Sequence, residues 1–415
     1  MSQPVVPSAA LRAWLAAAWP PLLVVLLGYI VVCVVMLRTF DYNPTGPIRI
    51  GTMLPADRFW SESTKVTEGV GYDGQWFFYL AHDPLLRAPN PETYLDLPAY
   101  RYARILYPTL AWMLALGQPA AVPWTLLIVN LLAGLLGTAA ALDLLRQLKA
   151  NRWLAVGYAF SPPVLIGLTA ALAEPTALAL VTAGVALAVR GKHWAAGLAL
   201  MLAVLAREPS ILVPVGFGLY ALARLDWRRG IAYLLPLGVP VLWHLSILAR
   251  LGALPSAQSP TNFGVPFGGA YYRLGLLLGW HPPMLGEPLP TDNIWPEATI
   301  ILLSAAIVVI GLTKVLERRD AFAWTLFLQA VLALGTGPLV WADLFSYGRV
   351  LGLLYFAFAL CLLTHPRRAA AFPARLSEWT IEIPAWTKSL EIPKTAVTTA
   401  LGLALVSMKR LRQSS

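Results

Sequence analysis

The sequence predicts an all-α polytopic membrane protein with about ten transmembrane helices and a large first loop outside the membrane that carries interfacial helices. Hydrophobic residues make up 58% of the chain and charged residues only 13%. Apolar runs near the length of a bilayer crossing recur along the sequence, which soluble globular proteins do not show. No linker or internal repeat divides the chain, so we expect one membrane domain over residues 1–364 and a tail over 365–415.

The net charge of +10 does not indicate a nucleic-acid partner. The basic residues sit in short clusters between apolar runs, which is how orientation in a membrane is encoded. Both cysteines, Cys33 and Cys361, lie inside apolar segments. We therefore expect neither a disulfide framework nor a thiolate metal site.

The first apolar run, Trp19 to Leu37, is long enough to cross a bilayer. The residues after it lack the small-residue pattern of a signal-peptidase site. We interpret this run as an uncleaved signal anchor.

The gaps between later apolar runs differ in positive charge, and cytoplasmic loops hold the excess of Lys and Arg. The gaps that we place in the cytoplasm contain Arg146, Lys149 and Arg152; Arg190 and Lys192; Arg224, Arg228 and Arg229; Lys314, Arg318 and Arg319; and Arg367 and Arg368. The gaps that we place outside are residues 171–175, 207–210, 250–297 and 342–349.

Two apolar runs compete for the single crossing that this orientation allows before the gap at 146–152. The run 105–117 is short and contains Pro108, whereas 122–145 is long enough to span. We therefore expect 105–117 to lie at the interface, anchored by Trp112 and Tyr107. The first outer loop then covers about 38–120, and a loop of this size is usually functional.

The remaining predicted spans are about 153–171, 174–189, 194–206, 210–224, 231–249, 298–316, 321–341 and 350–364. The span 194–206 is short before Arg207 and Glu208, so we expect its outer end inside a water-filled cavity. In the tail, residues 395–408 could form an eleventh span or an interfacial helix, and the sequence leaves both open.

The stretch "GYDGQWFFYLAHDP", residues 71–84, predicts a helix from Gly74 to His82 with Asp73 as its N-cap and Pro84 helping to stop it. One interpretation is structural: a cap and an interfacial aromatic face of Trp76, Phe77 and Leu80. The other is chemical, because a carboxylate at a helix N-terminus on the outer side could take a proton from an acceptor hydroxyl. The two roles of Asp73 are compatible.

This stretch, with "RYARILYPTLAWMLALG", "AEPTALAL" and "LAREPS", resembles the GT-C class of membrane glycosyltransferases. The similarity extends to GPI-anchor mannosyltransferases, which carry an Asp-plus-aromatic segment in the first outer loop, and to lipid A aminoarabinose transferases. In layout it covers most of residues 19–364, and the loop motif is its specific part.

The resemblance implies a cell-envelope glycosyltransferase, inverting at the sugar carbon, in an inner or plasma membrane. It implies a sugar on a polyprenyl phosphate as donor, a glycan, lipid or protein as acceptor, contact with membrane lipids, and Asp73 as catalytic base. The Asp-Glu pair of the class is absent because Gly74 follows Asp73. That departure leaves dependence on a divalent cation open.

Nucleotide sugars are cytoplasmic, so a transferase with its site outside needs a lipid carrier as donor. Its phosphate leaving group benefits from nearby arginines. Four candidates precede the interfacial helix or stand at outer ends of spans: Arg101, Arg104, Arg207 and Arg349. Each could instead be a snorkelling or ion-paired structural arginine.

Other candidates are weaker. Glu174 could pair with Arg207 or bind the acceptor, and Gln75 is a further substrate-binding candidate beside Asp73. His82 could relay protons, although a helix C-terminus also favours a structural histidine. Asp41, just after the first span, is the second candidate for the base.

The rival function is a lipid or solute transporter or flippase, and a catalytically inactive membrane scaffold is a third possibility. Buried charges within spans would favour transport, and Asp143 is the one acid well inside an apolar run. Motifs such as HExxH, GxSxG or a Gly-rich phosphate loop do not occur, so hydrolase, zinc and ATPase functions have no support.

Overall fold

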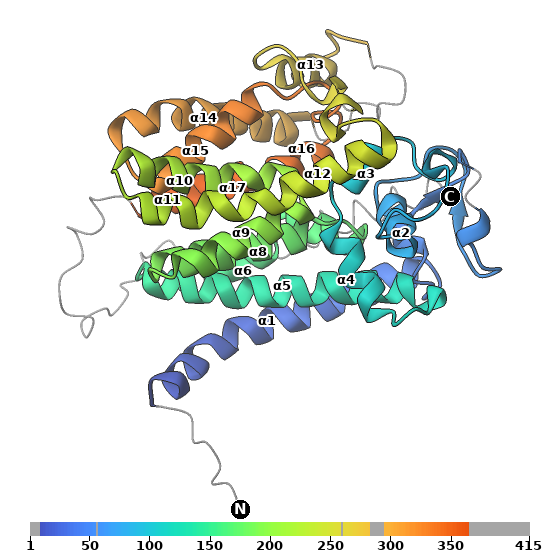
Figure 1. Ribbon diagram of the computed structural model, residues 1–415, viewed down its shortest axis with the longest axis horizontal. Coiled ribbons are helices and arrows are strands. Elements are labelled where there is room, and N and C mark those ends of the chain that lie inside the picture. The colour runs from blue at the N-terminus through green and yellow to red at the C-terminus, as the bar shows by residue number, and fades with distance from the viewer. Residues whose placement is uncertain (1–8, 55–56, 259, 283–293, 365–415) are drawn as a thin grey trace, which may run out of the picture.

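The computed structural model describes residues 9–54, 57–258, 260–282 and 294–364, and these fold almost entirely into α-helices. The long helices lie side by side, and the short helices α2, α3 and α4 gather at one end of the bundle (Figure 1). The helices are α1 (Ala9–Thr39), α2 (Gly74–His82), α3 (Pro98–Tyr102), α4 (Leu106–Leu114), α5 (Val122–Gln147), α6 (Leu154–Ala159), α7 (Pro162–Thr169), α8 (Glu174–Val189), α9 (His193–Ala206), α10 (Leu212–Ala223), α11 (Trp227–Leu234), α12 (Gly238–Leu251), α13 (Gly268–Leu277), α14 (Ile294–Glu317), α15 (Ala321–Leu334), α16 (Leu344–Val350) and α17 (Gly352–Leu363).

Several helices expose apolar side chains in a way that suits lipid rather than water. On α1, Leu27 is 53% and Val31 49% exposed, and α12 and α14 are likewise covered with exposed aliphatic residues. Within the described residues, four helical stretches are long and apolar enough to cross a membrane, or five if the bent pair α16 and α17 is one span. The all-α, membrane-embedded class is therefore supported.

The described residues contain fewer helices of spanning length than the predicted count of about ten, because several of the predicted spans are short helices. Spans 174–189, 194–206 and 210–224 correspond to α8, α9 and α10. The predicted span 153–171 is broken into α6 and α7 near Ser161, and 321–341 ends as a helix at Leu334. Beyond Leu334 the chain leaves the helix, and Thr336 forms an isolated bridge with Phe263.

The basic gaps that the structure describes, between residues 146 and 319, lie at the opposite end of the bundle from α2 (Figure 1). Arg190, after α8, forms an ion pair with Asp143 near the end of α5. Arg318, after α14, donates a hydrogen bond to the Cys361 carbonyl near the end of α17. At the opposite end of the bundle, Arg349 on α16 is in an ion pair with Asp73 before α2 and lies near Glu174 at the start of α8.

The first loop folds over a hydrophobic core that it shares with α5 and with residues 170–173. Its two short strands, β1 (Ile50–Gly51) and β2 (Val66–Thr67), pair in parallel. Helix α2 has the predicted bounds, but Trp76, Phe77 and Leu80 are at most 5% exposed. The predicted interfacial aromatic face is therefore wrong: α2 is apolar on nearly all sides, and such a helix is buried in protein.

Helix α4 packs between α2 and α5, which corrects one of its two predicted anchors. Trp112 is partly exposed, but Tyr107 is fully buried and donates a hydrogen bond of 3.1 Å to the Leu126 carbonyl. Its hydroxyl also accepts from Asn130. Tyr107 thus joins α4 to α5 and cannot anchor the helix in a lipid headgroup layer.

Candidate functional site

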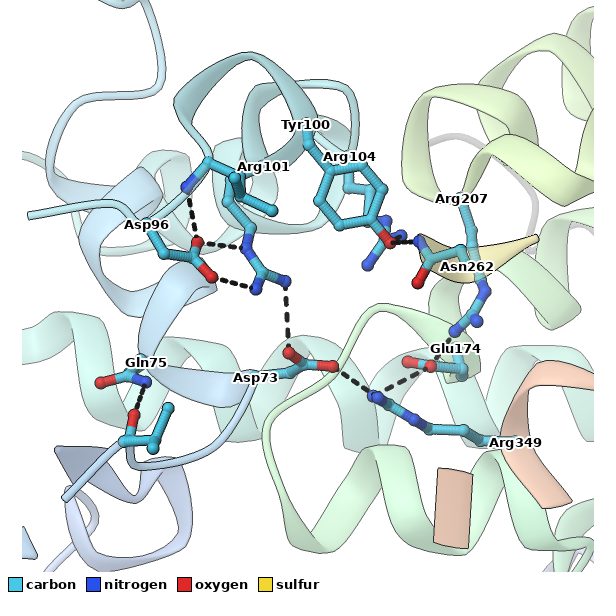
Figure 2. A network of polar contacts seen from close by, with 12 residues as sticks. Asp73, Gln75, Asp96, Tyr100, Arg101, Arg104, Glu174, Arg207, Asn262 and Arg349 are labelled. Atoms are coloured by element: carbon cyan, nitrogen blue, oxygen red, sulfur yellow. Dashed lines mark hydrogen bonds and ion pairs between the residues drawn. The ribbon is translucent and has the colours of Figure 1, made fainter. Parts of the chain in front are cut away.

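Asp73 lies at the N-terminal end of α2, and both of its carboxylate oxygens are in ion pairs (Figure 2). Arg101 Nη1 is 3.2 Å from Oδ1, and Arg349 Nη2 is 2.5 Å from Oδ2. The side chain makes no capping hydrogen bond to α2. The predicted side-chain cap is therefore wrong, because the carboxylate is turned toward the two arginines.

These arginines set the protonation of Asp73. Burial alone would raise the pKa of this carboxyl, but the guanidinium groups of Arg349 and Arg101 outweigh burial and hold the pKa well below its usual range. Asp73 is therefore ionised at neutral pH. A carboxylate in this state is a weak proton acceptor until a cation leaves it.

Gly74 explains the missing Asp-Glu pair in physical terms. A β-carbon at position 74 would overlap the Ala170 carbonyl oxygen and crowd that of Ile48. A glutamate cannot occupy this position without moving the backbone of two other segments. The close approach also brings Asp73 against the segment that follows α7.

Glu174 is the second carboxylate near Arg349. It begins α8, is only 4% exposed, and is in an ion pair with Arg207, as the sequence predicted as one alternative. Arg349 Nη1 lies 3.5 Å from its Oε1. Arg349 is thus shared between Asp73 and Glu174, and its helix α16 meets α17 at a bend of 51°.

The other two predicted arginines have carboxylate partners too. Arg101 pairs with Asp96 at 2.7 Å as well as with Asp73. Arg104 pairs with Glu208 at 2.9 Å and also donates to the Tyr100 hydroxyl. Ion pairs therefore connect Arg101, Asp73, Arg349, Glu174 and Arg207 in one series, and Arg104 with Glu208 forms a separate pair beside it; we call these residues together the network, in which acids balance the cations.

The remaining predicted residues lie apart from this network. Gln75 accepts from Gly51 N at 2.9 Å and donates to the Val70 carbonyl at 2.7 Å, so it holds the loop around β1. His82 is at the far end of α2 with Nδ1 2.8 Å from the Phe78 carbonyl, and burial lowers its pKa. Asp41 is exposed and paired with Lys65 at 2.5 Å.

The sequence interpretation missed several members of the network. Asp96 and Glu208 supply charge, and Asn262 donates a hydrogen bond of 3.2 Å to the Tyr100 hydroxyl. A signal existed for Glu208, which directly follows Arg207 in a short outer gap. For Asn262 there was none, because its contact depends on how the loop after α12 folds back.

No protein-family model, curated protein or solved structure matches the chain. In the part of the chain that the structure describes, no group of three or more His, Cys, Asp or Glu side chains is arranged to hold a metal ion. What the site offers is a partly buried carboxylate and several guanidinium groups within reach of one another. Such a site can bind an anion and, once a cation moves away, accept a proton.

Proposed function

We propose that the chain is an inverting membrane glycosyltransferase that moves a sugar from a polyprenyl-phosphate donor to a hydroxyl acceptor on the extracytoplasmic face. The supporting observation is Asp73, a carboxylate at the start of a buried helix held between Arg101 and Arg349. The loop motif that resembles the GT-C class carries this same aspartate. The chemistry needs a base for the acceptor and cations for the phosphate, and this cluster supplies both.

The ion pairs suggest how donor binding would prepare the base. A donor phosphate competes with Asp73 for Arg349, which already lies between two carboxylates. When Arg349 turns to the phosphate, the pKa of Asp73 rises because a neighbouring cation has left. The hydroxyl oxygen of the acceptor then attacks the sugar carbon while Asp73 takes the proton of that hydroxyl. The bond from the sugar carbon to the phosphate oxygen breaks on the opposite side.

This exchange predicts two different acid limits. Protonated Asp73 cannot act as a base, so the rate falls as pH drops through its pKa. For kcat/KM, which reports the free enzyme, we expect the fall below the ordinary aspartate pKa of about 3.9. For kcat, which reports the donor complex, we expect the fall in rate at higher pH. Equal limits in the two pH profiles would show that Arg349 stays on Asp73.

We further propose about ten membrane crossings in an inner or plasma membrane, with the first loop and the cluster outside. Labelling of Gln118→Cys, in a chain with Cys33 and Cys361 replaced by Ala, tests this orientation because Gln118 is exposed between α4 and α5. We expect an impermeant thiol reagent to reach it from outside. Lys192→Cys, in an exposed basic gap, is the matched control and should react from the cytoplasm. The opposite pattern would overturn the orientation.

Purified protein incubated with a panel of polyprenyl-phosphate sugars and hydroxyl acceptors tests the function. We expect transfer from at least one donor, with inversion at the sugar carbon. If every donor remains intact while labelled lipid crosses the bilayer of vesicles that contain the protein, a flippase is the better description of the function.

Residues 395–408, for which the sequence left two possibilities, lie outside the described residues.

A further inference from the structure

Arg49 is a cation of the first loop that differs from the four arginines of the network. Those four are each in an ion pair with at least one carboxylate. For Arg49, the described residues provide neither an ion pair nor a side-chain hydrogen bond, and its Nε is buried without a partner. It follows Ile48 and precedes Ile50, both fully buried, so its position in the fold is well defined.

Tyr72 connects Arg49 to the candidate base. The Arg49 guanidinium carbon lies 5.4 Å from the centre of the Tyr72 ring, and so does that of Arg349. Tyr72 directly precedes Asp73 in the chain. Arg49 and Arg349 therefore share one aromatic ring beside the carboxylate that Arg349 occupies.

The backbone holds Arg49 in a conformation that non-glycine residues rarely adopt. Its φ is 56°, in the left-handed region. Arg49 N donates to the Gly46 carbonyl at 3.1 Å, and its own carbonyl accepts from Tyr72 N at 3.0 Å. A strained residue fixed from both sides is a common feature of ligand-binding sites, and here it keeps the side chain beside Tyr72.

The electrostatic environment leaves the Arg49 charge poorly compensated. Burial lowers its pKa, and the opposing influences of Tyr72 and Asp343 are smaller. Asp343 forms no ion pair with it and instead accepts hydrogen bonds from Ser346 N and Oγ. A guanidinium group with a buried, unpartnered Nε and no close anion is unfavourable, and a bound anion would stabilise it.

We propose that Arg49 is a ligand of the donor phosphate, on which it acts together with Arg349 across the Tyr72 ring. This inference rests on the proposed function and names a residue that the network alone does not. Arg49 can bind the anion without breaking an ion pair, whereas Arg349 must first leave Asp73. Arg49 is thus the first contact for the phosphate, and Arg349 follows when it exchanges partners.

Binding of a polyprenyl monophosphate to the purified full chain, compared with the polyprenol lacking phosphate, tests the assignment. We expect wild type to prefer the phosphate and Arg49→Gln to weaken that binding by about 10-fold to 100-fold, the size of a charge-assisted hydrogen bond. Binding of the polyprenol should not change. Arg87→Gln is the matched control, because Arg87 is an exposed arginine of the same loop.

Arg49→Lys covers the case in which Arg49→Gln does not fold. It keeps a cation beside Tyr72 but loses the planar fork that binds phosphate, so we expect an intermediate loss of affinity. Wild-type affinity for the phosphate in either folded variant, or equal binding of polyprenol and its phosphate by wild type, would overturn the proposal. If the expected losses occur but no sugar is transferred from any donor, the phosphate site stands and the transferase proposal fails.

Discussion

Asp73→Asn is expected to reduce sugar transfer by about 10² to 10⁴-fold, the usual contribution of a general base. Asparagine keeps the size of the side chain, and its single amide oxygen can still accept a hydrogen bond from one of the two arginines, but it cannot take a proton. Because Asp73 makes no capping bond to α2, the helix loses nothing at its N-terminus. Arg349 retains Glu174, so the variant should fold. Initial rates, with donor binding measured separately, check this.

Asp41→Asn is the matched control, since it removes a carboxylate of the same loop that is exposed and contacts Lys65. We expect near-normal transfer. If Asp41→Asn abolishes transfer and Asp73→Asn does not, then Asp41 is the base and the arginine cluster around Asp73 is structural. If neither variant loses activity, the first loop does not supply the base.

Local features of the sequence were sufficient to place some of the helices. Asp73 and Pro84 bracket α2, and its observed bounds, Gly74–His82, are the predicted ones. Helix α8 likewise begins at Glu174 and ends at Val189, where a basic gap follows. Punctuation by proline, glycine and charge acts within a few residues, so a single sequence reveals it.

The environment of α2 was harder to predict, although its composition held the relevant signal. Apolar residues cover nearly the whole helix, and Gln75, its main polar residue, turns to the backbone around β1. A membrane-surface helix needs one polar face, whereas a helix apolar all round is buried. The aromatic residues indicated an interface only because the fold of the surrounding loop was unknown.

Apart from the pair of Arg207 with Glu174, the partners of the arginines could not be predicted from the sequence. Arg349 and Asp73 are separated by 276 positions, and Arg104 and Glu208 by 104. Which carboxylate each arginine meets depends on the packing of α16 and α9 against the first loop. The gaps between apolar runs placed these arginines and Asp73 on the outer side, but the pairing is a property of the tertiary structure.

An ion pair away from the candidate site, between Arg273 and Glu297, is expected to have the largest effect on stability. Arg273 on α13 and Glu297 in the first turn of α14 are 1% and 3% exposed, and Arg273 Nε lies 2.8 Å from the carboxylate. The Arg273 Nη1 and Nη2 atoms are buried without hydrogen-bond partners in the described part of the chain. The attraction between the two charges thus has to offset a large desolvation penalty.

Arg273→Met is expected to lower the free energy of unfolding by about 3 to 5 kcal/mol, because it leaves the Glu297 carboxylate buried without this cation. The double variant Arg273→Met/Glu297→Leu should recover most of that loss, since apolar replacement of a whole buried pair is often neutral. Lys65→Met breaks the exposed pair with Asp41 and should cost less than about 1 kcal/mol. Denaturant unfolding in one detergent compares all three. Equal losses for Arg273→Met and Lys65→Met would mean that water or lipid headgroups reach Glu297, and that α13 does not seal the start of α14.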